Sequence, residues 1–300
     1  MDMPPFKPVH GVLWMLASGL SFVGVNGLVR ALGTDLPAAQ SAFIRFGFGV
    51  LFLLPTLAPL LRAGMPRQAW RVLGLRGVLH TAAVICWFYA MARLPVAEVT
   101  AIGYLNPVLV TLGAALFFGE VLALRRILAV AVAICGAAII LRPGLREVTD
   151  GHLAQVGAAF FFAGSYLCAK RLSGLISASA IVAMMSLTVT LGLLPFAIWV
   201  WVPVTLLQMA ALALVALFAT LGHYCMTRAF VVAPLTVTQP VTFLQLVWAT
   251  LLGALVFGEG VDAFVLLGGG LIIAAISYIT FREAVLRRQQ ITPPVNATKL

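Results

Sequence analysis

The sequence predicts an all-α integral membrane protein of ten transmembrane helices, arranged as two inverted-topology repeats of five helices. Three observations predict this fold: a composition that is 62% hydrophobic and only 9% charged, ten successive apolar runs, and segments of the first half that recur in the same order in the second. A soluble domain has about 45–50% apolar and about 25% charged residues. The composition therefore places the chain in the membrane class.

Ten apolar runs, separated by short connections, fill nearly the whole chain. Each run approaches the roughly 20 residues that a helix needs to cross a bilayer. A backbone in lipid must satisfy its hydrogen bonds internally, so these runs are expected to be helices. We expect spans at 11–30, 39–61, 71–92, 97–118, 125–141, 152–170, 178–201, 207–228, 235–257 and 263–281.

The runs divide the chain into four parts. We expect a cytoplasmic N-terminal segment over 1–10, a first five-helix repeat over 11–145, a second over 151–282, and a polar, disordered cytoplasmic tail over 283–300. With these spans, fourteen of the 19 Lys and Arg residues lie on the side of the N-terminus and four on the opposite side. Cytoplasmic loops are enriched in Lys and Arg. Both termini are therefore predicted to be cytoplasmic, and the net charge of +10 reflects topology rather than nucleic-acid binding.

Three segments of the first half recur in the second. The helix start at Gly11 matches that at Gly151, the pattern from Tyr89 to Arg93 recurs from Tyr224 to Arg228, and the ending at Glu120 recurs at Glu259. Each match alone is weak, because apolar sequences resemble one another by chance. Three matches in the same order indicate an internal duplication.

The odd number of spans in each repeat has a consequence for topology. After five crossings the second copy must enter the membrane from the opposite face, which produces an inverted pair. Alternating-access transporters are commonly built on such pairs. The duplication therefore favours transport over a purely structural role.

These features resemble the EamA family of the drug/metabolite transporter superfamily. The resemblance covers about residues 10–282 and includes the Phe-Gly-Glu endings, the stretch from Phe22 to Asn26 followed by Arg30, and the Asn106–Pro107 pair. The counterpart of Pro107 is Leu246, so the pattern is weaker in span nine. Overall likeness is greatest to the YddG-like amino acid exporters. It implies export of small metabolites, especially aromatic or other neutral amino acids, across the bacterial inner membrane through a central cavity.

Polar and aromatic residues within spans are candidates for substrate binding, because such residues are costly against lipid and face the bundle interior or a cavity. We expect the cavity to be lined by spans three, four, eight and nine. The candidates are Trp14, Ser18, His80, Trp87, Tyr104, Asn106, Tyr166, His223, Gln245 and Trp248. Interface anchoring or packing is the alternative role for several of them.

The charges inside the spans point to the kind of substrate. No Asp or Glu lies in the middle of an expected span, so proton coupling would have to use His80 or His223. Arg45 lies about two turns inside span two and is expected to snorkel outward. We therefore expect a neutral, aromatic cavity, gradient-driven passage, and zwitterionic or apolar substrates rather than polyanions.

Other classes of function find little support in the sequence. The four cysteines lack metal-ligand spacing, no His-Glu-x-x-His motif occurs, and the four histidines are expected to have no carboxylate partners. We predict no metal, no cofactor and no catalytic residue. The predicted partners are a small-molecule substrate and the lipid bilayer, with no nucleic acid, and the protein is expected to act as a monomer. A lipid or lipid-phosphate flippase and a membrane-embedded enzyme remain alternatives.

Overall fold

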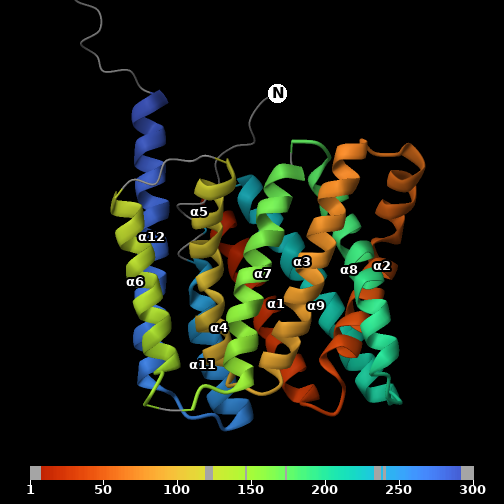
Figure 1. Ribbon diagram of the computed structural model, residues 1–300, viewed down its shortest axis with the longest axis horizontal. Coiled ribbons are helices and arrows are strands. Elements are labelled where there is room, and N and C mark those ends of the chain that lie inside the picture. The colour runs from red at the N-terminus through yellow and green to blue at the C-terminus, as the bar shows by residue number, and fades with distance from the viewer. Residues whose placement is uncertain are drawn as a thin grey trace, which may run out of the picture.

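The computed structural model describes residues 8–118, 124–145, 147–172, 174–232, 238 and 241–291. Helices stand side by side across the molecule (Figure 1). They are α1 (Pro8–Leu32), α2 (Ala38–Ala63), α3 (Arg67–Met91), α4 (Val96–Gly103), α5 (Leu105–Phe118), α6 (Leu124–Leu141), α7 (Asp150–Leu172), α8 (Ala178–Trp199), α9 (Leu206–Val232), α11 (Leu244–Phe257) and α12 (Ala263–Ile291).

The helices confirm the predicted membrane fold. In the described part of the chain, eight helical segments are long and apolar enough to span a bilayer, with α4 and α5 together forming one of them. Two shorter apolar helices, Ile127–Leu141 and Leu244–Phe257, bring the number to the ten expected. Large apolar side chains such as Leu51, Leu194 and Leu255 are exposed on the outside of the bundle, as a lipid-facing surface requires.

Spans four and nine are both interrupted near their middle. Tyr104 separates α4 from α5, and Phe243 immediately precedes α11. These two residues are 139 positions apart, the same offset that relates Glu120 to Glu259. The interruptions are therefore equivalent features of the two repeats. Glu120 itself lies outside the described residues.

Helix packing joins the two halves throughout. The main partners are α1 with α9, α3 with α7, α2 with α8, and α6 with α12. The repeat makes α1 equivalent to α7 and α3 equivalent to α9, so the first two pairs are equivalent to each other. Each of the other two pairs joins a helix to its own equivalent in the other half. Figure 1 shows α6 and α12 together at one edge, and α2 and α8 at the other. The halves thus form one interlocked bundle, as an inverted pair should.

Glycine allows the closest of these approaches. A methyl group added to Gly136 on α6 would lie 2.6 Å from the backbone carbonyl oxygen of Gly268 on α12. Small residues at helix crossings let backbones approach in this way and are typical of membrane proteins.

The helix ends differ from expectation at the C-terminus. The chain after Arg282 is expected to be a disordered tail, but α12 continues to Ile291. Arg, Gln, Glu, Ala and Leu make up much of this stretch and are good helix formers, so the helix extends into the polar segment. Residues 292–300 lie outside the described part, and the domain boundaries themselves remain a prediction.

Candidate substrate cavity

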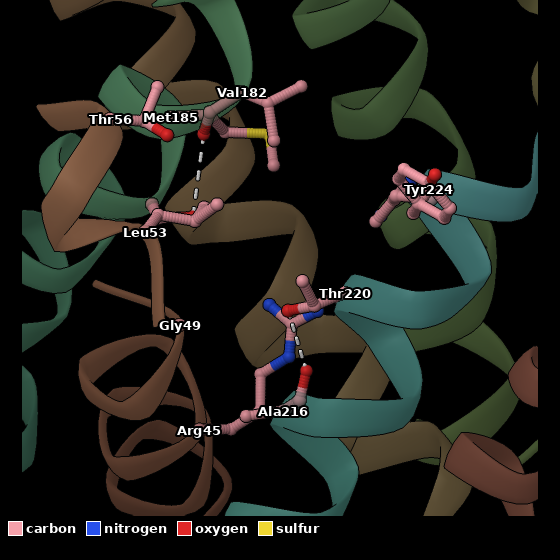
Figure 2. Close-up of a pocket in the computed structure, with 11 residues that line it drawn as sticks. Arg45, Gly49, Leu53, Thr56, Val182, Met185, Ala216, Thr220 and Tyr224 are labelled. Atoms are coloured by element: carbon pink, nitrogen blue, oxygen red, sulfur yellow. Dashed lines mark hydrogen bonds between the residues drawn. The ribbon is translucent and has the colours of Figure 1, made fainter. Parts of the chain in front are cut away.

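A cavity of about 290 Å³ lies between α2, α8 and α9 (Figure 2). Because α2 belongs to the first half and the other two helices to the second, it lies at the interface between the repeats. Its volume is close to the lower end of the range for small-molecule sites. The lining residues are Arg45, Gly49, Leu53, Thr56, Val182, Met185, Ser186, Ala216, Thr220, His223 and Tyr224.

The cavity lies well inside the helices. Arg45 is seven residues from the start of α2, and Thr220 is fourteen residues from the start of α9, near the middle of that helix. At a rise of 1.5 Å per residue these positions are about 10 and 21 Å along their helices. Midplane sites at the repeat interface are typical of transporters with inverted repeats.

Most of the cavity wall is apolar, and two of its hydroxyl groups bond to their own helices. Ser186 Oγ donates to the carbonyl of Val182 at 3.4 Å, and Thr220 Oγ1 donates to the carbonyl of Ala216 at 2.8 Å. Figure 2 shows the bond from Thr220 to Ala216 as a dashed line. Their oxygen lone pairs remain able to accept hydrogen bonds from a ligand.

Arg45 is a basic group in this wall. From its position in the sequence, the Arg45 side chain was expected to snorkel outward. This expectation is wrong, because Arg45 lines the cavity and extends toward Thr220 on α9 (Figure 2). Its guanidinium carbon lies 4.0 Å from the centroid of the Phe46 ring. Within the described part of the chain it has no hydrogen-bond or ion-pair partner. An arginine at the centre of a transmembrane helix costs about 2.5–3.5 kcal/mol on insertion scales, so a water-filled cavity is the environment in which it is tolerated.

A second arginine lies directly behind the cavity wall. Arg76 Nη2 is 3.1 Å from the sulfur of Met185, which itself lines the cavity. Its other donors bond to Ser165 Oγ at 3.4 Å and to the carbonyl of Ile181 at 3.1 Å. From the sequence, Arg76 is one of the fourteen basic residues assigned to the N-terminal side, but its side chain is buried within the bundle. The interior is therefore basic rather than neutral.

Two of the expected histidines lie in this basic region. His223 lines the cavity and packs edge to face against Phe22, with ring centroids 5.0 Å apart. His80 is buried behind the wall, where Nδ1 is 3.0 Å from the hydroxyl of Ser165.

Three further candidates lie around this region without lining the cavity. Trp14 packs edge to face against the lining residue Tyr224, at 6.1 Å between centroids. Ser18 Oγ donates to the carbonyl of Gly222 at 2.9 Å and so joins α1 to α9. Tyr166 is 45% exposed and stacks on Phe162, which in turn packs against His80.

The remaining five candidates lie outside the cavity between α2, α8 and α9. Trp87 packs against its neighbour Phe88 in the main core cluster. Tyr104 packs against Phe243, and Asn106 Nδ2 donates to the carbonyl of Ala159 at 3.2 Å. Gln245 and Trp248 are partly buried on α11. Among the described residues, spans three, four and nine therefore contribute no lining residue to this cavity, whereas spans two, seven and eight do.

Sequence reasoning missed most of the lining residues, and one signal could have found them. An ionisable residue inside a span is by default a functional candidate, and Arg45 is such a residue. Helical spacing from Arg45 leads to Gly49, Leu53 and Thr56 on the same face of α2. The lining on α8 is mainly apolar and carries little signal of its own, and His223 is the one α9 lining residue among the candidates chosen from the sequence.

Ion pairs gather at one end of the bundle. This end, at the lower edge of Figure 1, is where α1 ends and α7 begins, and we call it the distal face. Arg30 Nε lies 2.8 Å from Glu259 Oε1. The other oxygen of this carboxylate, Oε2, accepts a hydrogen bond from the backbone N–H of Val96 at 2.9 Å. Arg142 pairs with Asp262 on the same face. These contacts tie together helices from both halves.

A buried pair on the distal face corrects another expectation. His152 Nε2 lies 2.9 Å from Glu98 Oε1, so one histidine does have a carboxylate partner. The backbone N–H of Thr149 donates to His152 Nδ1 at 3.0 Å, which leaves Nε2 as the nitrogen that donates to Glu98. The pair joins the first turn of α4 to the first turn of α7. Over the described residues, no group of three His, Cys, Asp or Glu side chains is arranged to hold a metal.

The ten spans, the inverted packing and a cavity at the repeat interface define a multi-pass membrane protein of the transporter class. The model of the EamA-like transporter family matches residues 9–142 and again 149–281, and the chain belongs to this family. The chain is therefore a membrane transporter in its family and fold.

Curated relatives are similar over nearly the whole chain. A riboflavin transporter of Rhizobium johnstonii is 33% identical, covering 97% of this chain and 96% of the relative. A pseudopaline exporter of Pseudomonas aeruginosa is 30% identical, covering 88% of this chain and 94% of the relative. An S-adenosylmethionine uptake transporter of Rickettsia bellii is 26% identical, covering 91% of this chain and 94% of the relative. A solved crystal structure matches with a TM-score of 0.61 at 17% identity, covering 92% of this chain and 99% of that one, which shows the fold alone.

Proposed function

We propose that this chain is a secondary transporter that carries small metabolites with an aromatic ring across the bacterial inner membrane. The observation that supports this most directly is the cavity between α2, α8 and α9, at the interface of the two halves. Its wall combines apolar side chains with Tyr224 and His223, a lining suited to a flat ring. Aromatic amino acids, which the family resemblance implies, belong to this class.

Riboflavin is a second candidate substrate. It is favoured by the 33% identity over nearly the full length to a protein named as a riboflavin transporter. A flavin also has a flat heteroaromatic ring system. Since the relatives include both an exporter and an uptake transporter, we propose that the substrate gradient sets the direction of net flux.

We propose that the two halves work by alternating access. Ion pairs join helices of both halves at the distal face, and we propose that this face opens when they separate while contacts form at the other face. With the positive-inside bias, we propose that the termini are cytoplasmic and that the distal face is external. The lining residues of the cavity all come from one chain, so we propose that the protein functions as a monomer.

Purified protein in liposomes tests the proposal. Radiolabelled tryptophan and riboflavin should enter protein-containing vesicles faster than protein-free ones and should compete with each other. Leucine, a neutral amino acid without a ring, is the matched comparison and should compete poorly. Scrambling of a labelled lipid without uptake of either ring compound would instead support the flippase alternative.

A further inference from the structure

We infer that Arg45 forms a subsite for an anionic oxygen group, a carboxylate or a phosphate, of the transported molecule. The inference rests on the proposed function and names the chemical class of the preferred substrate: a ring compound with an anionic group, carried in preference to a neutral or cationic one. It uses one guanidinium, the cavity that it faces, and the distribution of carboxylates in the described chain.

The arginine side chains near the ends of the helices and inside the bundle differ in their partners. On the distal face Arg30 bonds Glu259, and Arg142 pairs with Asp262. Inside the bundle Arg76 donates to protein oxygen atoms and contacts a methionine sulfur. Arg45 differs from all three, because within the described residues its guanidinium has no hydrogen-bond or ion-pair partner and lies over the face of the Phe46 ring.

The groups that face the Arg45 guanidinium carry no negative charge in the described part of the chain. The lining residues there include neither Asp nor Glu, so none of them neutralises Arg45. Arg76 lies one side chain behind the wall at Met185 and adds a further positive charge. An anion entering the cavity therefore gains attraction from two arginines in a medium that screens charge less than water does. A cation experiences repulsion from the same groups.

The Arg45 guanidinium also has the shape to bind an anionic oxygen group. A guanidinium presents planar N–H donors that match the paired oxygens of a carboxylate or phosphate. The hydroxyls of Ser186 and Thr220 already donate to backbone carbonyls, so Arg45 is the stronger donor facing the cavity. The apolar wall formed by Leu53, Val182 and Ala216 remains for the ring. An amino acid would leave its ammonium group without a carboxylate partner in this lining, so a simple aromatic acid fits better.

The test uses ring compounds that differ mainly in charge. Wild-type protein in liposomes is given indole-3-acetate, tryptophan and tryptamine, and separately riboflavin and riboflavin 5′-phosphate. We expect the anionic member of each series to be transported at least about tenfold faster than the neutral or cationic member, because charge-assisted hydrogen bonds are the stronger ones. Preference for indole-3-acetate alone identifies a carboxylate, and preference for the flavin phosphate alone identifies a phosphate.

Variants separate the role of Arg45 from a general effect on folding. Arg45→Gln should reduce transport of the anionic member about tenfold more than that of the neutral member, while Arg45→Lys should retain part of the preference. Arg62→Gln, at the exposed end of the same helix, is the matched control and should keep the wild-type ratio. A thermal-shift measurement in detergent adds a readout without transport: indole-3-acetate or riboflavin 5′-phosphate should stabilise wild type more than Arg45→Gln.

Distinct outcomes overturn the inference and the proposed function. Wild type that transports ring compounds without regard to charge would leave the proposed function standing and refute the anion subsite. Wild type that transports no ring compound would refute the proposed function. In that case the thermal-shift measurement decides about the subsite. Stabilisation of wild type but not of Arg45→Gln by the anionic probes would support it, and equal or absent stabilisation would refute it.

Discussion

The rings of Tyr104 and Phe243 meet edge to face, with centroids 5.6 Å apart and planes at 89°. Each residue interrupts one span, and the two interruptions are equivalent positions of the repeats. The phenol of Tyr104 also donates to the backbone carbonyl of Phe243 at 3.5 Å. The discontinuous helices of the two halves therefore contact each other at their breaks.

This contact predicts an energetic coupling between the two repeats. Tyr104→Ala and Phe243→Ala should each lower the free energy of unfolding, and the double variant should lose less than their sum by about 1 kcal/mol, a typical value for an aromatic pair. Unfolding of purified protein in mixed micelles measures this. Tyr104→Ala combined with Phe196→Ala, at an exposed ring on α8, should be additive. Additivity for Tyr104 and Phe243 would show that their contact is energetically unimportant.

The Glu259 carboxylate is predicted to hold the distal face closed. It bonds Arg30 and the first backbone N–H of α4, and its side chain is only 9% exposed. Glu259→Ala leaves both donors without their acceptor, so we expect a loss of about 1–3 kcal/mol in stability and easier opening on that face. Reactivity of a cysteine at Thr220 toward an impermeant thiol reagent, in a protein without its four native cysteines, measures the opening. Glu147→Ala, at an exposed carboxylate on the same face, should have no such effect.

The interior histidines are predicted not to be obligatory proton carriers. Acidic groups in the described spans lie at helix ends, and His80 is held by the Ser165 hydroxyl behind the cavity wall. His80→Gln keeps a hydrogen-bonding group but removes the titrating one. Uptake by this variant and by His223→Gln should persist, and wild type should transport without an imposed pH difference. Stimulation of wild type by a proton gradient, lost in either variant, would establish histidine-based coupling.

The orientation of the chain is predicted from its basic residues. Although Arg76 is inside the bundle and no longer counts, the bias toward the N-terminal side remains large. A reporter fused after Leu300 should therefore be active only in the cytoplasm, and one inserted in the α8–α9 loop only outside. A reporter signal from the external side at Leu300 would mean an odd number of spans or a reversed molecule.

The sequence predicts the fold well and the site poorly, for physical reasons. A span must be apolar over about 20 residues, so hydropathy marks it directly, and the repeated Glu120 and Glu259 endings preserve the register. A cavity depends instead on which helix faces meet, and span periodicity does not encode that pairing. Polar side chains are also ambiguous: Ser18 joins two helices, whereas Thr220, of the same chemical kind, faces the cavity. Arg45 was visible in the sequence, but snorkelling could be distinguished from cavity lining only in the structure.

The account depends most on the cavity between α2, α8 and α9 being the path of the substrate. Gly49 lines this cavity, and a Cβ added there meets only Ser186 Oγ, at 3.8 Å, so a side chain can extend into the space without a backbone clash. Gly47, on the same helix, has no atom within 4 Å of an added Cβ and lies outside the cavity lining. The two positions are matched in helix and residue type, and an added Cβ meets no backbone atom within 4 Å at either.

The most direct measurement compares Gly49→Phe with Gly47→Phe in liposomes, at equal amounts of protein that elutes as a single peak in detergent. The account predicts that Gly49→Phe abolishes uptake of the ring compounds, because its side chain projects into the cavity and obstructs the space for a ring, while Gly47→Phe transports like wild type. Uptake by Gly49→Phe at the wild-type rate would contradict the account and place the substrate path elsewhere in the bundle.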